Sequence, residues 1–185
     1  MNMDLLITYA LLNNDHVINA VAKTREGIPL INVNRSPSGV YPMIEYHQIG
    51  GGDVNFADME VFIERNTFQL TFFCKAEEYM DVRDELLRTL RNISFKVMHE
   101  YTFKDMTTDI TNYVVHIRSF IERVYFDTMM AEQTELYNQR YGNDTPIPDG
   151  TYFDEVENTD YKYIDDLVKD ELPVYDDTEG LEFLN

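Results

Sequence analysis

A single stretch, residues 59–93, most constrains what this chain can fold into. Its first half alternates Phe68, Leu70 and Phe72 with polar residues, and this period of two predicts a half-buried strand. Its second half predicts an amphipathic helix, because apolar residues recur at steps of three and four, namely Tyr79, Val82, Leu86, Leu90 and Ile93. A strand and a helix that are each apolar on one side must bury those sides against each other.

The same periodicities predict the other helices and strands. Helices are expected at residues 4–13 and 128–141, and Asp15 is expected to cap a short helical turn that follows the first of them. Strands are expected at residues 28–33, 41–47, 95–103 and 113–126. The fold class predicted from this order is α+β, with a mixed, mainly antiparallel β-sheet flanked by helices and an extended acidic C-terminal segment.

Within the predicted strand at residues 95–103, the aromatic and apolar residues occupy alternate positions. Phe95, Val97, His99, Tyr101 and Phe103 are therefore expected on one side of the strand. A long strand at residues 113–126 beside the long strand at residues 60–74 predicts that antiparallel pairs form the centre of the sheet.

Charge and composition divide the chain. The net charge is −19, and residues 151–185 hold twelve acidic residues and two lysines. We therefore expect a domain at residues 1–127, a helix at 128–142 and an acidic, aromatic extension at 143–185. Purely disordered tails are usually poor in aromatic residues. Tyr161, Tyr163 and Tyr175 are accordingly predicted to dock on this domain, on a neighbouring subunit or on another protein.

Composition also limits the partners. A chain this acidic is a poor nucleic-acid binder, because DNA affinity comes largely from Lys and Arg that neutralise phosphates. The only cysteine, Cys74, lies in the predicted central strand and is expected to be a buried thiol. The first twelve residues do not resemble a signal peptide, and no apolar run is long enough to span a membrane. We expect the protein to stay in a reducing cytoplasm, without membrane contact.

No segment contains a known catalytic motif, so we expect no enzymatic activity, no cofactor and no metal. A sheet could bring His47, His99 and His116 together as metal ligands, but their spacing in the sequence gives no such indication. The glycines at 50–52 are not followed by the lysine and serine or threonine of a phosphate-binding loop. The acids around Gly150 lack the spacing of a calcium-binding loop.

Candidate interface residues lie in predicted loops, at exposed arginines and in the C-terminal extension. Gly50, Gly51, Gly52 and Asp53 open a stretch without periodicity that is expected to be a flexible loop as far as Ala57. Arg35 lies in a second predicted loop, at residues 35–39. Other arginines are expected to be exposed on the strand domain, where they would meet acids of a neighbouring subunit: Arg65, Arg118 and Arg123.

Taken together, the order of elements resembles the tail terminator, or tail completion, proteins of long-tailed bacteriophages. The resemblance covers residues 4–126. Its parts are an apolar N-terminal helix, the strand Pro42-Met43-Ile44-Glu45, the strand Thr67-Phe68-Gln69-Leu70-Thr71-Phe72-Phe73, the helix at 79–93 and the strand Val115-His116-Ile117-Arg118-Ser119-Phe120. Met43 stands where the family usually has an aromatic residue.

The resemblance implies a structural virion protein of the tail and neck, assembled in the host cytoplasm. Such proteins form a hexameric ring at the head-proximal end of the tail tube, end its polymerisation and join the tail to the head-tail connector. The implied partners are copies of the chain itself, the tail tube protein, the connector and the tail sheath, while DNA passes through the central hole without specific binding. Two alternatives remain open: another neck or head-completion protein, or an acidic adaptor or inhibitor that binds a basic partner.

Overall fold

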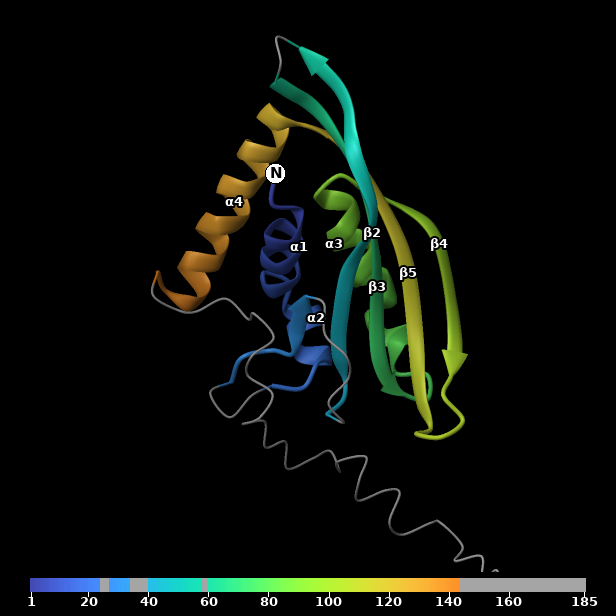
Figure 1. Cartoon of the computed structure of the whole chain (residues 1–185). Coiled ribbons are helices and arrows are strands. Elements are labelled where there is room, and N and C mark those ends of the chain that lie inside the picture. The colour runs from blue at the N-terminus through green and yellow to red at the C-terminus, as the bar shows by residue number, and fades with distance from the viewer. Residues whose placement is uncertain (24–26, 34–39, 58–59, 144–185) are drawn as a thin grey trace, which may run out of the picture.

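The computed structural model describes residues 1–23, 27–33, 40–57 and 60–143, which form one β-sheet with helices against one of its faces (Figure 1). The elements follow in the order α1 (Met3–Leu12), α2 (Asp15–Ala20), β1 (Ile31–Val33), β2 (Met43–Ala57), β3 (Glu60–Lys75), α3 (Tyr79–Asn92), β4 (Phe95–Lys104), β5 (Ile110–Glu122) and α4 (Arg123–Tyr141). The strand order is β1-β2-β3-β5-β4. Only the β1–β2 pair is parallel, so the α+β prediction and the mainly antiparallel sheet are confirmed.

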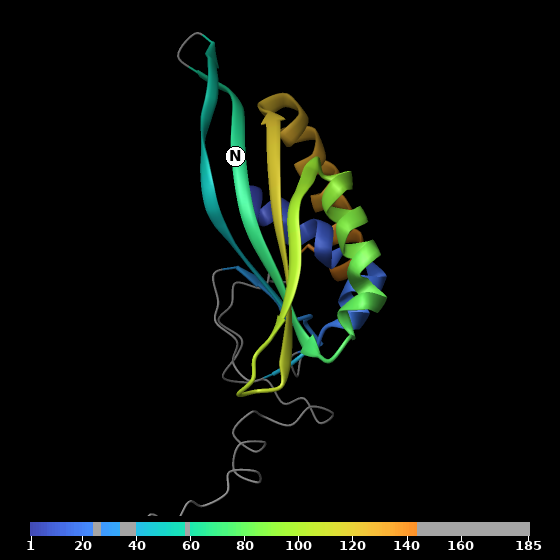
Figure 2. The same cartoon turned by 90° about the vertical axis from the view of Figure 1, so that its right-hand side faces the viewer.

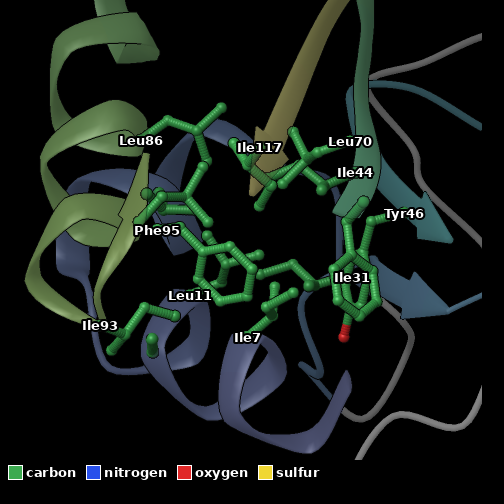
Figure 3. Close-up of a cluster of buried hydrophobic side chains, with 14 of the residues drawn as sticks. Ile7, Leu11, Ile31, Ile44, Tyr46, Leu70, Leu86, Ile93, Phe95 and Ile117 are labelled. Carbon is green, nitrogen blue, oxygen red and sulfur yellow. The ribbon is translucent and has the colours of Figure 1, made fainter. Parts of the chain in front are cut away.

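The core lies between the sheet and the helices, as Figure 2 shows edge-on. Phe68, Leu70 and Phe72 of β3 point into it, and α3 packs onto them with its predicted apolar stripe. Ile7 and Leu11 of α1 contribute to the same core from the helix layer (Figure 3). The predicted pairing of the central strand with the helix that follows it is therefore confirmed. Cys74 is buried as predicted, and burial raises the pKa of its thiol to about 12.

Helix α1 is buried on nearly all sides, although the sequence indicated only one broad apolar face. Every residue from Leu6 to Leu12 is buried. The reason is α4, which packs on the side of α1 away from the sheet through Tyr137, whose ring lies 4.8 Å from that of Tyr9. A helix that is covered on both sides needs apolar residues around its whole circumference.

Several element boundaries differ from the sequence prediction. The cap of α2 is Asn14 and not Asp15, because the Asn14 side chain accepts hydrogen bonds from the backbone N–H groups of His16 and Val17. The predicted strand at 28–33 shortens to β1. Likewise, the predicted strand at 113–126 ends at Glu122, where α4 begins. Phe126 is β-prone, but it belongs to the core together with Tyr137, and that packing decides the local structure.

A hydrogen-bonded ion pair joins α3 to β4. Arg83 binds Glu100 through two nitrogens, with Nε 3.2 Å from Oε2, and the Tyr113 hydroxyl donates to the same carboxylate at 2.6 Å. The bonds from Arg83 and Tyr113 hold the pKa of Glu100 below its usual value. The ring of Tyr113 also stacks on Tyr79 at the start of α3, with 5.0 Å between centroids. This cluster fixes the edge strand β4 to the helix layer.

We expect Glu100→Gln to lower the free energy of unfolding by about 1–2 kcal/mol at neutral pH, since hydrogen bonds to a charged group are lost and the pair is partly solvent-exposed. Because the folded-state pKa of Glu100 is depressed, the stabilisation is present above the unfolded pKa of about 4.3 and is lost as pH falls through the folded pKa. Urea unfolding between pH 7 and pH 3 measures this difference.

The matched control is Asp84→Asn, which removes the other carboxylate that contacts Arg83. The Asp84 side chain is almost fully exposed, so no measurable change is expected. Equal losses in the two variants, or a Glu100→Gln loss that does not shrink with acidification, would show that the cluster does not stabilise the fold in this way.

Candidate functional site

The face of the sheet opposite the helices, here called the open face, has most of its centre and upper part uncovered (Figure 2). At its lower end, the segment before β2 packs over Met43 and Ile110 through Ala22, Leu30, Val40 and Tyr41. Above this cover, the side chains of β2, β3, β5 and β4 form rows across the sheet, because paired residues of neighbouring strands point to the same side.

A β-bulge in β4 decides which residues reach the open face. The register between β4 and β5 shifts between Val97 and His99, so that Met98 is the extra residue. Phe95 lies in the core, whereas His99 pairs with His116 on the open face. The prediction that the odd-numbered residues of β4 share one side is therefore wrong, since an extra residue moves all later side chains to the opposite face.

One row across the open face contains the three strand histidines. The register aligns His47 with Gln69, Gln69 with His116, and His116 with His99. His116 Nε2 lies 3.1 Å from Gln69 Oε1, and the rings of His99 and His116 are 6.2 Å apart. The sheet thus gathers the histidines into one row, but with Gln69 between them. Over the part of the chain that the structure describes, no three His, Cys, Asp or Glu residues are placed to hold a metal ion.

Cations lie just above the histidine row. Arg118 pairs with Lys96 of β4 and donates from Nε to Thr67 Oγ1 at 3.2 Å. One row further up, Arg65 pairs with Phe120 and is exposed. None of these three cations has an ion pair with a carboxylate among the described residues, whereas Arg83, Arg88, Lys104 and Arg140 all have one. The upper open face is therefore a basic region on a strongly acidic protein.

Exposed aromatic rings lie on the same face as these cations, with Phe120 in the row of Arg65 and with Tyr101 and Phe103 below the histidine row. Tyr101 is 40% exposed, Phe103 52% and Phe120 58%. Tyr101 contacts the His116 ring edge-on at 5.9 Å and stacks with Phe103 at 6.4 Å. Several large exposed aromatic side chains on one face of a monomer usually mark a binding surface. The sequence analysis did not identify Lys96, Tyr101, Phe103 or Phe120 as site residues. The bulge places Lys96 on the same face as Tyr101 and Phe103, and no sequence pattern predicts it.

The predicted interface residues fall into three groups. Arg65 and Arg118 lie together on the open face, while Arg123 is exposed at the first position of α4. Gly50, Gly51, Gly52 and Asp53 are part of β2 and not of a flexible loop, so that prediction is wrong. The remaining candidates lie outside the described residues: Arg35, Tyr161, Tyr163 and Tyr175.

The glycines at 50–52 allow β2 to continue beside β3 through a distorted register. Register shifts occur between Gln48 and Gly50 and again after Asp53. A Cβ atom on Gly51 would collide with the Gln48 side chain, which donates to Asn66 Oδ1 at 3.0 Å, and would lie only 3.2 Å from the Arg65 carbonyl oxygen. A glycine-rich stretch without periodicity is typical of loops, but in this chain it forms part of a bulged strand.

The β2–β3 hairpin projects beyond the rest of the sheet as a two-stranded arm (Figure 1). Pairing of β3 with β5 stops at Ile63, whereas pairing of β2 with β3 continues to Ala57 and Glu60. Beyond Ile63, the pairs Phe56–Val61 and Ala57–Glu60 therefore have no third strand beside them within the described structure, and these residues form the arm. An isolated two-stranded ribbon is marginally stable in water, so this arm gains most from contact with another surface.

Both sides of the sheet also end in unpaired strand edges. β4 pairs only with β5, and β1 covers β2 only over Ile44 to Tyr46, which leaves residues 47–57 of β2 without a strand partner on that side among the described residues. Free edges present unpaired N–H and C=O groups to other chains. Within the same residues, no helix is both long and apolar enough to cross a bilayer.

Comparison with known proteins gives no relative from which a role could be transferred. No model of a known protein family matches the sequence, and no curated protein matches it significantly.

Proposed function

We propose that this chain is a tail terminator of a long-tailed bacteriophage, a structural subunit that forms a ring with copies of itself and caps the head-proximal end of the tail tube. The observation that carries the proposal is the pair of free strand edges on opposite sides of one sheet, combined with a projecting arm. The resemblance in the order of elements supports the same role.

In the proposed ring, the free edge of β4 in one subunit pairs with the free part of β2 in the next. Such a contact is head-to-tail, because two different edges meet. The assembly closes into a ring when a whole number of the rotations between neighbouring subunits completes one full turn. The twist of the sheet supplies a rotation of the kind that curves such an assembly. A closed ring also leaves no free edge for uncontrolled aggregation.

The arm formed by the ends of β2 and β3 contacts the tube in this proposal. A two-stranded ribbon that needs a further surface for stability is suited to binding the end of a tube, where it adds backbone hydrogen bonds to exposed strands. The opposite end of the ring then faces the head-tail connector. The net charge of −19 agrees with a pore through which DNA moves without being held.

The self-association test is a mass measurement by light scattering across a concentration series, with electron microscopy of the largest species. A hexamer has a mass of about 131 kDa, six times the 21.8 kDa of one chain. We expect closed rings at high concentration or on addition of purified tube protein. A particle that remains monomeric under both conditions contradicts the proposal and favours the acidic adaptor.

A pair of neighbouring proline variants tests the edge. Successive N–H groups of an edge strand point alternately toward the neighbouring strand and toward the free edge. Of Thr102→Pro and Phe103→Pro, one therefore breaks a hydrogen bond to β5, and the other removes only a donor at the free edge. The variant that removes only the free-edge donor is recognised by its retained melting temperature. It should associate at least about tenfold more weakly, as expected when a backbone contact is lost at a subunit interface.

Partner choice separates the two virion roles. A pull-down with purified tube protein and with purified connector protein should capture the tube protein through the arm. Binding to the connector alone would identify the chain as another neck or head-completion protein instead.

A further inference from the structure

We propose that the acidic, aromatic segment at residues 151–185 docks on the open face of its own chain. The open face and this segment carry charges of opposite sign. The open face has three cations without ion-pair partners among the described residues, namely Arg65, Lys96 and Arg118, together with three histidines in the adjoining row. Two acidic residues, Glu45 and Glu122, lie on the same face in register with Thr71 and Ile63.

The segment at 151–185 has the complementary composition. It holds twelve acidic residues against two lysines, and so contributes more than half of the net charge of −19. The cations of the open face favour contact with these acids, because opposite charges attract at short range.

The apolar parts also match. The segment contains six aromatic residues, Tyr152, Phe153, Tyr161, Tyr163, Tyr175 and Phe183. Tyr101, Phe103 and Phe120 are exposed on the same open face, with Phe120 beside Arg65 and the other two below the histidine row. Aromatic pairs contribute beyond the area they bury, and arginine stacks favourably on aromatic faces. The open face therefore offers both kinds of contact that the segment can make.

Reach and tethering favour the chain's own segment over one from another copy. α4 ends against α1 and α2, since Arg140 binds Asp15 with 2.6 Å between Nη1 and Oδ1, and the Tyr141 hydroxyl donates to the Leu12 carbonyl oxygen at 3.0 Å. Eight linker residues, 143–150, span up to about 26 Å when extended, and the segment itself adds 35 further residues, so the chain is long enough to pass around an edge of the sheet. A tethered segment also has a millimolar effective concentration.

A sheet face with aromatic rings and arginines also resembles the binding surface of single-stranded nucleic acid. The net charge of −19 disfavours a free polyanion, whereas the acidic segment is tethered to the domain and does not have to associate from solution. Docking of the segment is intramolecular and does not depend on the proposed ring, so the two proposals can fail separately.

The test is carbodiimide coupling of the full-length protein, which joins an amine directly to a carboxylate that touches it. Lys96 is exposed and lies on the open face beside Arg118. An equal mixture of isotope-labelled and unlabelled protein is coupled at about 1 µM, far below the effective concentration of a tethered segment. Mass spectrometry of the digest then identifies the joined peptides and whether both come from one chain.

We expect Lys96 to couple to acids of 151–185, with both peptides carrying the same isotope. The reference for random encounter is Arg91→Lys, which places an amine at an exposed position of α3 on the helix-covered side. Coupling at Lys96 should exceed coupling at that position by about tenfold, as the effective concentration of a docked segment implies. It should fall severalfold at about 0.5 M salt, where charges are screened within about 4 Å.

Two charge variants complete the design. Arg65→Gln should lower the coupling of Lys96 about two- to fivefold, whereas Arg91→Gln, an equal change of charge on the other side, should leave it unchanged. Equal coupling at both sides, coupling mainly between differently labelled chains, or no effect of Arg65→Gln would each overturn the proposal. So would protection of Lys96 by an oligothymidine strand at low micromolar concentration, since this would identify the open face as a nucleic-acid site.

Discussion

Phe68→Ala should lower the free energy of unfolding by about 3–5 kcal/mol, the largest effect that we expect from a single substitution in this chain. Phe68 lies in β3 at the centre of the sheet and is fully buried, with its ring 5.9 Å from that of Phe95 in an edge-on contact. Removal of the ring leaves a cavity between the sheet and α3 that neighbouring side chains fill only in part. Urea unfolding followed by circular dichroism measures the loss.

Phe120→Ala is the matched control for this prediction. It removes the same side chain from the neighbouring strand β5, but the ring is 58% exposed on the open face. The expected change is within about 0.5 kcal/mol, as for most surface substitutions. If the two variants lost similar stability, the helix-covered side of the sheet would not be the principal core, and the assignment of faces would be wrong.

Tyr137→Ala should lower the free energy of unfolding by about 3 kcal/mol and release α4 from the domain. Tyr137 is buried and lies between Tyr9 of α1 and Tyr141, with 4.8 Å between ring centroids on each side. Only Phe126 and Tyr137 of the nineteen residues of α4 are buried. A helix held by so few apolar contacts depends on each of them, because helical stability in proteins comes mostly from packing.

Hydrogen exchange locates this effect within the molecule. The amides of α4 should exchange faster in Tyr137→Ala, while those of β3 and β5 are expected to change in proportion to global stability only. Leu136→Ala, at a neighbouring position that is 48% exposed, should leave both unchanged. Uniformly faster exchange in every element would indicate that α4 does not open separately from the sheet.

The open face and the free edges place two binding functions on different parts of one sheet. The edges of β2 and β4 offer backbone groups, which suit pairing with other copies, whereas the open face offers a group of cationic side chains together with aromatic rings. A subunit with this arrangement can assemble through its edges while its face is occupied by its own acidic segment. The proposed ring and the proposed docking are therefore compatible.

The sequence by itself determined the elements whose signals are local. The alternation of Phe68, Leu70 and Phe72 and the stripe of Val82, Leu86 and Leu90 predict the central strand and α3, because each periodicity is set by the geometry of its own segment. The α+β class followed from their order. The thiol of Cys74 was also expected to be buried, since it continues the same strand.

Only the tertiary structure decided which face each later side chain occupies and where irregular segments pair. The bulge at Met98 moves Tyr101 and Phe103 to the open face, and the strand at Gly51 exists because β3 pairs with it. Likewise, Phe126 is helical because the core receives it together with Tyr137. The free energy of a one-residue register shift depends on the strand that pairs with it, and that of a long-range contact depends on both partners. The local sequence pattern therefore does not predict either of them.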